Sequence, residues 1–294
     1  MIKESKARRA FLAVNGTGLI LYALLCLVPF FNLLAISLSS AGAVDAGNVT
    51  FFPIDFTTNA YQFLLAKQEF FVAFGWSILR VVLGTGISMA VMILGAYPLS
   101  RAEDEFVGRG FYAGFFIVTM FFSGGLVPTF IVISKLNLLN SIFALVLPTA
   151  MNAWNMVLLI NFFRQIPKEM IESAKLEGAG HMTILLRMVL PVSLPALATV
   201  ILFTAVQHWN SWFDGVIYMK PDKFPLQSYI YNMINEYNTL AQSTDPEKQA
   251  LLENLPGKTL RSAQIFVAMI PIMLVYPFAQ KYFVKGLVMG SVKE

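Results

Sequence analysis

Charged side chains are scarce in this sequence. They make up 13% of its 294 residues, whereas hydrophobic side chains make up 57% and the mean hydropathy is +0.66. Soluble globular domains carry about 25% charged residues, so the composition excludes an ordinary soluble domain. The few charges are unevenly placed, and they leave six windows without a formal charge: 10–44, 81–100, 110–134, 136–163, 188–213 and 262–280.

Cysteine and histidine are nearly absent as well. Cys26 is the only cysteine, so the chain can form no internal disulfide and no cysteine-based metal site. The only histidines are His181 and His208, and the sequence contains no visible nucleophile–base pair or histidine cluster. We therefore predict that the chain has no catalytic site and no metal site.

The chain also lacks the residues that would let it use a proton gradient or ATP by itself. All 17 acidic residues lie outside the six uncharged windows. Proton-driven carriers commonly use ionisable residues inside the membrane, so this absence disfavours a secondary carrier. A phosphate loop is missing too, because Leu252 in LENLPGKT (252–259) occupies the first glycine position of G-x-x-x-x-G-K-[ST]. The chain is predicted to bind no ATP and no other cofactor itself.

The uncharged windows predict the fold class. A helix of about 20 apolar residues crosses the hydrocarbon core, and only helices or closed barrels satisfy the backbone in lipid. The windows are continuously apolar rather than alternating, which excludes a barrel. We predict an all-α integral membrane protein with six transmembrane helices. The first apolar run, from Phe11 to about Leu38, is longer than the roughly 7 to 15 residues of a signal peptide core and is predicted to be retained.

Basic residues indicate the orientation, because short cytoplasmic loops are enriched in Lys and Arg. If the N-terminus is inside, thirteen of the 21 basic residues fall on the cytoplasmic side. We therefore predict that both termini and the 168–187 loop are cytoplasmic. This topology accounts for the pI of about 9.1 without a nucleic-acid partner. The thirteen are Lys3, Lys6, Arg8, Arg9, Arg101, Arg109, Arg164, Lys168, Lys175, Arg187, Lys281, Lys285 and Lys293.

Every window contains proline. Proline removes a helical hydrogen bond and kinks the helix. Kinked helices leave room for a pathway, but membrane helices also tolerate proline without such a role, and the sequence leaves both interpretations open. The prolines are Pro29, Pro98, Pro128, Pro148, Pro191, Pro195, Pro271 and Pro277.

The stretch KEMIESAKLEGAGHMTILLRMVLPVSLP (168–195) places a polar island between two apolar windows. Pro167 fits the first turn of a short helix, on which Met170, Ala174 and Leu176 fall near one side. Gly178 and Gly180 then predict a break before a second, apolar helix. Two roles fit this pattern: a helix that seals the bundle at the membrane surface, or one that docks onto a cytoplasmic partner.

The same stretch resembles the EAA loop of ABC-transporter permease subunits, written E-A-A, three residues, Gly, nine residues, I-x-L-P. The chain departs from it at Ser173, which replaces alanine, and at Met188, which replaces isoleucine. The resemblance implies that the loop couples the membrane helices to separate ATPase subunits, with Glu172 paired to a basic group on the ATPase. The coupling residues it implies are Glu172, Ser173, Ala174, Gly178, Ala179 and Pro191.

Further segments resemble the permeases of carbohydrate importers, closest to the group that takes up larger oligosaccharides: FFSGGLVPTF (121–130), IPKE (166–169), HWNSWFDGVIYM (208–219) and FPLQ (224–227). The resemblance implies a type I ABC importer permease fold in a bacterial inner membrane. It divides the chain into an N-terminal segment, 1–70, with the first span, and a permease domain, 71–290.

The implied partners are a second, related permease subunit, two ATPase subunits that hold ATP and Mg, an extracytoplasmic solute-binding protein and membrane lipid. The implied substrate is an oligosaccharide, either acidic, such as an alginate- or pectin-derived fragment, or neutral. Two alternatives to this function are a secondary carrier and a membrane scaffold that transports nothing.

Two groups of side chains are candidates for the substrate pathway. Those in the fourth window, which equally suit hydrogen bonds between helices, are Asn152, Trp154 and Asn155. Those at the outer end of the fifth window, which equally suit an interfacial aromatic belt, are His208, Trp209, Asn210 and Trp212. Arg80 is predicted to snorkel outward, the alternative being contact with an anionic substrate. The long outer loop, 208–263, is expected to be partly helical and to meet the binding protein.

Overall fold

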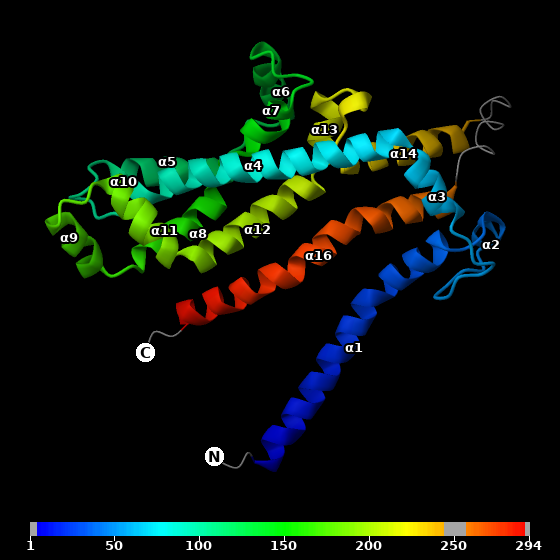
Figure 1. Cartoon of the computed structure of the whole chain (residues 1–294), viewed down its shortest axis with the longest axis horizontal. Helices are drawn as coiled ribbons and strands as arrows, with labels where there is room; N and C mark the ends of the chain where they lie inside the picture. Colours follow the sequence, from blue (N-terminus) through cyan, green and yellow to red (C-terminus); the bar gives the residue numbers. More distant parts are fainter. Residues whose placement is uncertain (1–4, 244–256, 292–294) are drawn as a thin grey trace. The chain divides into compact units, whose positions relative to one another are not determined.

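The computed structural model describes residues 5–243 and 257–291, and every regular element in these ranges is a helix (Figure 1). The three longest are α1 (Lys6–Ser37), α4 (Gln68–Ser100) and α16 (Lys258–Ser291). The others are α2 (Ala41–Asp45), α3 (Asn59–Ala66), α5 (Arg109–Phe121), α6 (Leu126–Lys135), α7 (Ile142–Val146), η1 (Leu147–Thr149), α8 (Ala153–Arg164), α9 (Lys168–Leu176), α10 (His181–Ile184), η2 (Leu185–Val189), α11 (Leu190–Val192), α12 (Leu194–Asn210), α13 (Phe213–Tyr218), η3 (Pro221–Lys223) and α14 (Leu226–Ala241).

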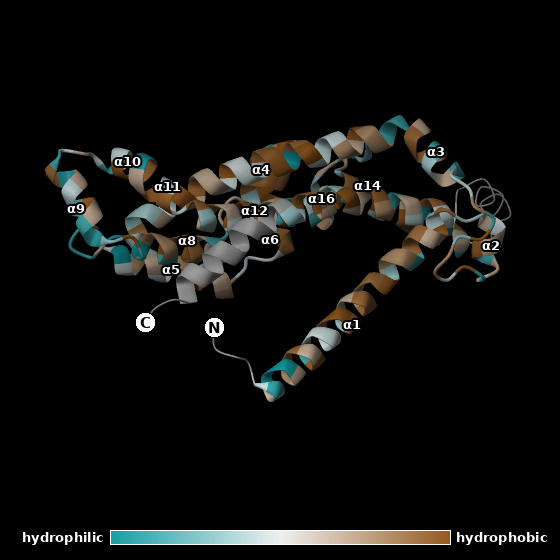
Figure 2. Cartoon of the chain, turned by 60° about the horizontal axis from the view of Figure 1, so that its bottom comes forward, coloured by the Kyte–Doolittle hydropathy of each residue, from teal (hydrophilic) through white to brown (hydrophobic). Residues whose placement is uncertain are grey.

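Three continuous helices are long and apolar enough to cross a membrane: α1, α4 and the part of α16 from Lys258 to Pro277. Figure 2 shows hydrophobic residues along most of α4, whereas polar residues gather at α9. Three further pairs pass the same test only as bent spans. If each pair counts as one span, the total is the predicted six, and the all-helical fold is confirmed.

Bends interrupt three of the six predicted spans, namely the third, the fourth and the fifth. The third bends by 115° between α5 and α6, the fourth by 52° before α8, and the fifth by 83° between α11 and α12. At the first bend Gly125 has φ +82°, which glycine adopts freely. At the third, Pro195 has no N–H to continue the helical ladder. By contrast, Pro29 and Pro98 lie inside unbroken helices.

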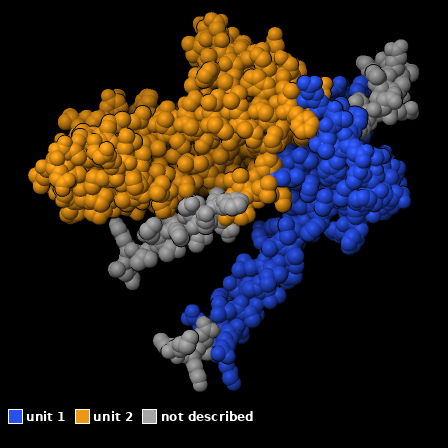
Figure 3. Space-filling model, viewed as in Figure 1, with its two compact units in different colours: residues 1–68, 233–270 blue, residues 69–232, 271–294 orange. Residues whose placement is uncertain are grey.

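The chain divides into two compact units (Figure 3). The first comprises residues 1–68 and 233–270. Within it, the hydroxyl groups of Ser37 and Tyr61 are hydrogen-bonded at 2.8 Å, which ties the end of α1 to α3. Asn32 donates its side-chain amide to the carbonyl of Thr50 at 2.6 Å, and this bond fixes the segment that follows α2.

The second unit comprises residues 69–232 and 271–294, and α4 carries a hydrophobic cluster near each of its ends. Near the end of α4, Met92, Ala96 and Leu99 pack with residues of α8 and of the 168–195 stretch. Near its start, partly buried side chains of α4 pack against a cluster built from α6, α7, α13 and the segment after it. The 168–195 stretch is therefore part of the core at one end of α4.

The 208–263 loop is partly helical, as expected, because α13, η3 and α14 lie within it. Most of the segment that resembles a phosphate loop, 252–259, lies outside the described residues.

Candidate functional site

The helix α9 is anchored to the unit by one apolar face. Ile171 and Ala174, three residues apart and therefore on one side of the helix, are buried in the cluster that contains Phe163 and Ile184. Glu169 lies in the first turn, where a negative charge suits the positive end of the helix dipole. The buried face therefore holds the helix in place, and the opposite face is not needed for packing.

That opposite face is exposed. Glu172 and Ser173 are exposed, and Leu176 retains 90% of its accessible surface. The prediction that Leu176 shares the side of Ala174 is therefore wrong, and Ile171 takes the buried position instead. At about 100° per residue, position 176 lies about 170° from the mean direction of Ile171 and Ala174, so it falls on the opposite side of the helix.

The turn after α9 closes the helix with two backbone hydrogen bonds to its last turn. The N–H of Ala179 donates to the carbonyl of Ala174 at 2.9 Å, and the N–H of Gly178 donates to Lys175 at 3.0 Å. This pair of bonds is the Schellman motif, which requires a left-handed residue at the position of Gly178. Gly178 has φ +80°, as the motif needs.

The second half of the stretch is helical, as predicted, but irregular. It runs through α10, a π-helical segment and α11, with Ile184, Leu185 and Val189 buried in the core. Single π turns often occur at functional sites. Pro191 is exposed near the end of this segment, just before the 83° bend.

Two polar contacts join the 168–195 stretch to the spans. The Tyr97 hydroxyl lies 3.3 Å from Nδ1 of His181, which links α4 to the start of α10. The Lys175 ammonium lies 3.1 Å from Glu105, which links α9 to the connection between α4 and α5. Together with the buried face of α9, these contacts attach the stretch to α4 and to the connection that follows it.

The candidate pathway residues of the fourth window do not form one site. Asn152 caps α8, because its side chain accepts from the N–H of Asn155 at 3.0 Å. Asn155 is buried, and its amide lies 3.5 Å from the Thr204 hydroxyl on α12, an interhelical contact. Trp154 is exposed on the surface of α8.

The candidates at the end of the fifth window lie in different surroundings. His208 and Trp209 are buried. His208 packs directly on Gly84 of α4, where an added Cβ would lie 2.5 Å from Nε2. Asn210 is exposed. The Trp212 ring stacks on Tyr231 with centroids 4.0 Å apart.

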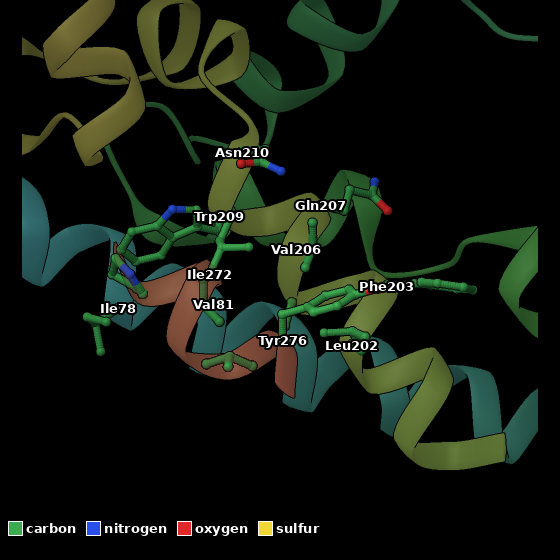
Figure 4. A pocket seen from close by; sticks show the side chains of 13 residues that line it. Ile78, Val81, Leu202, Phe203, Val206, Gln207, Trp209, Asn210, Ile272 and Tyr276 are labelled. Carbon is green, nitrogen blue, oxygen red and sulfur yellow. The ribbon is translucent and has the colours of Figure 1, made fainter. Parts of the chain in front are cut away.

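Trp209 and Asn210 meet in an apolar cavity of about 560 Å³ between α4, α12 and α16 (Figure 4). Gln207 and Tyr276 also line it, and almost all of its surface is apolar. The remaining walls are mostly aliphatic. Of the seven predicted pathway residues, two, Trp209 and Asn210, line this cavity.

Arg80 does not snorkel, and the sequence-based prediction is wrong. Its side chain is 1% exposed and is paired with Asp214. Nη1 donates to Oδ1 of Asp214 at 3.1 Å and to the carbonyl of Ser211 at 3.2 Å. The sequence signal for this partner was the position of Asp214, the first charge after the uncharged window 188–213.

Asp214 organises the turn between α12 and α13. Its Oδ1 accepts from the Ser211 hydroxyl at 2.8 Å and from the N–H of Gly215 at 2.9 Å. Burial raises the pKa of the Tyr218 hydroxyl on α13, and the charge of Asp214 raises it further. Among the described residues, no group of three His, Cys, Asp or Glu side chains is placed to hold a metal ion.

Known proteins resemble this chain over nearly its whole length. It is 38% identical to the polygalacturonan/rhamnogalacturonan transport system permease protein YtcP of Bacillus subtilis, over 94% of this chain and 95% of that protein. Protein LplC of Bacillus subtilis is 34% identical over 99% of this chain and 97% of its own length.

A solved structure of a bacterial ABC transporter involved in the import of the acidic polysaccharide alginate superposes with a TM-score of 0.83 and 31% identity. The match covers 96% of this chain and 100% of that chain. The family model described as "Binding-protein-dependent transport system inner membrane component" matches residues 105–288, a range that contains the 168–195 stretch. The chain therefore belongs to the binding-protein-dependent transport system inner membrane component family, as a multi-pass membrane permease of the ABC transporter type.

Proposed function

We propose that this chain is one of two permease subunits in an ATP-driven importer that takes an oligosaccharide from an extracytoplasmic binding protein. Two separate ATPase subunits would hold ATP and Mg and would act on the chain through α9 and the Gly178 turn. In this arrangement both termini and the 168–187 loop lie in the cytoplasm.

The observation that carries this proposal is the two-sided construction of α9. One face is packed into the core through Ile171 and Ala174, while Glu172 and Leu176 remain exposed. A large exposed apolar side chain beside a carboxylate suits a partner groove with an apolar floor and a basic rim. Because the opposite face is anchored, a partner that moves α9 also moves the ends of α4 and α8.

The two polar contacts of the stretch also support transmission of movement from α9 to α4. The contacts of Tyr97 with His181 and of Glu105 with Lys175 join the stretch to the last turn of α4 and to the connection between α4 and α5. Closing of the ATPases on ATP would thus shift a rigid assembly rather than a loose loop. Such rigid-body motions between two states are a common way for nucleotide to drive a conformational change.

For the substrate, we propose an acidic oligosaccharide. The names of two relatives that are at least 30% identical refer to polygalacturonan/rhamnogalacturonan and to the acidic polysaccharide alginate. Arg80 is not the residue that meets the substrate charge, because Asp214 already engages its guanidinium. The aromatic rings and amides of the α12 cavity, with Trp209, Asn210 and Gln207, are the candidates for contact with sugar rings.

The direct test is transport by the reconstituted importer in proteoliposomes. ATP is enclosed, and the binding protein with a labelled oligogalacturonide is added outside. We expect uptake that stops when ATP is omitted and persists when a protonophore collapses the proton gradient. The reverse pattern would identify a secondary carrier. Stable purification of the chain without any ATPase, together with no uptake, would identify a scaffold.

The substrate class is tested separately by competition. Unlabelled oligogalacturonide should suppress the uptake, whereas a neutral oligosaccharide of the same length should not. If the neutral compound competes equally well, the acidic assignment fails while the importer assignment stands.

A further inference from the structure

A second polar cavity, of about 390 Å³, lies where α4, α5, α8 and α9 meet. Three arginines line it, each at the end of a different helix. Arg101 directly follows α4, Arg109 begins α5 and Arg164 ends α8. Lys168, the first residue of α9, adds a fourth cation.

Hydrogen bonds fix the arginines without neutralising them. Arg109 donates to the carbonyl of Arg101 at 3.1 Å, and Arg164 donates to that of Leu99 at 3.2 Å. Arg101 is buried, donates to the Ser100 hydroxyl and lies over the Tyr97 ring. Each guanidinium has five N–H donors, so most donors of the three remain available.

The charge of the cavity is only partly balanced. None of the three arginines has a carboxylate within 4.0 Å among the residues that the structure describes. Three carboxylates, of Asp104, Glu105 and Glu172, share the lining, but Glu105 is paired with Lys175. Four cations therefore face two unpaired carboxylates, which leaves an excess of two positive charges.

We propose that this cavity binds a phosphate-bearing anion, with an anionic phospholipid headgroup as one source and free phosphate as the other. Guanidinium groups match phosphate oxygens through paired hydrogen bonds. The cavity lies at the ends of the spanning helices, the depth at which basic pockets between such helices bind lipid headgroups. Phe111, Phe115 and Val118 of α5 are exposed beyond Arg109, and acyl chains would run along them.

The test uses the full-length chain, purified in neutral detergent and delipidated. Thermal unfolding and native mass spectrometry are followed with phosphatidylglycerol, with phosphatidylcholine and with inorganic phosphate. We expect phosphatidylglycerol to bind and stabilise, and phosphatidylcholine to do neither. Stabilisation by inorganic phosphate as well would show that the phosphate group suffices, whereas no effect of phosphate would assign the site to the lipid.

Variants locate the site. Arg109→Gln and Arg164→Gln should each weaken phosphatidylglycerol binding about tenfold, because each loses charge-assisted hydrogen bonds. Arg187→Gln is the matched control, since Arg187 is exposed and does not line the cavity. If Arg109→Gln does not fold, Arg109→Lys replaces it in the binding measurement, because it keeps the charge but loses the paired hydrogen bonds of the guanidinium. Equal binding of the two lipids, or an equal loss in Arg187→Gln, would overturn the proposal.

Discussion

Arg80 and Asp214 are separated by 134 residues in the chain and form an ion pair between α4 and the start of α13, in which the Arg80 side chain is 1% exposed and the Asp214 side chain 20%. Nε of Arg80 has no hydrogen-bond partner, so the carboxylate and the Ser211 carbonyl satisfy only part of the guanidinium. Removing one partner of a buried pair leaves an uncompensated charge in an apolar setting, which costs more than the pair contributes. The pair therefore fixes the turn between α12 and α13 to α4.

The difference between removing one partner of this pair and removing both gives the first prediction. Arg80→Met should lower the free energy of unfolding by about 1–3 kcal/mol, because it leaves the partly buried Asp214 without its cation. The double variant Arg80→Met/Asp214→Leu should recover most of that loss, since no buried charge remains. Unfolding by sodium dodecyl sulfate in mixed micelles measures both. Lys220→Met, at an exposed position nearby, is the control. A single variant as stable as the wild type would contradict the ion-pair assignment.

The contact between Gly84 and His208 gives the second prediction. An alanine Cβ at position 84 would lie 2.5 Å from Nε2 of His208, whereas at position 86 it would meet nothing within 4 Å. Gly84→Ala should therefore destabilise the protein by about 1–3 kcal/mol through overpacking. Gly86→Ala, in the same helix, should be neutral or slightly stabilising. The same unfolding measurement compares them, and equal effects would mean that α12 moves away from α4 at little cost.

The sequence was sufficient to locate the apolar helices and the 168–195 stretch. It was not sufficient to predict the directions of the helix axes or the contacts between distant residues. Hydropathy records which segments avoid water, so it located the helices of all six windows. Hydropathy carries no information on the direction of a helix axis, and so it did not predict the 115° bend near Gly125. The pairing of Arg80 with Asp214 was missed because the position of Asp214 at the end of an uncharged window does not say which residue, 134 positions away, it contacts.

The backbone of Gly178 gives the third prediction. Its φ of +80° disfavours any residue with a Cβ, although the space around it is open. Gly178→Ala should cost about 1–2 kcal/mol through backbone strain and should reduce ATP-driven uptake. Gly180 also has open space, but its φ of −73° suits alanine, and Gly180→Ala should leave uptake unchanged. Parallel loss in both variants would show that flexibility of the segment, rather than the left-handed turn, is what matters.

The two faces of α9 give the last prediction, which separates folding from coupling. Ile171→Ser should lower the free energy of unfolding by about 2–4 kcal/mol, because it removes a buried apolar side chain and buries a hydroxyl. Leu176→Ser should change it by less than about 0.5 kcal/mol, since Leu176 is 90% exposed. In the assembled importer, however, Leu176→Ser should weaken binding of the ATPase subunits and lower substrate-stimulated ATP hydrolysis, because it removes the exposed apolar contact. Leu65→Ser, which removes an exposed leucine from α3 rather than from α9, is the control for that measurement. If Leu176→Ser assembles and hydrolyses ATP like the wild type, the exposed face of α9 is not the surface on which the ATPase docks.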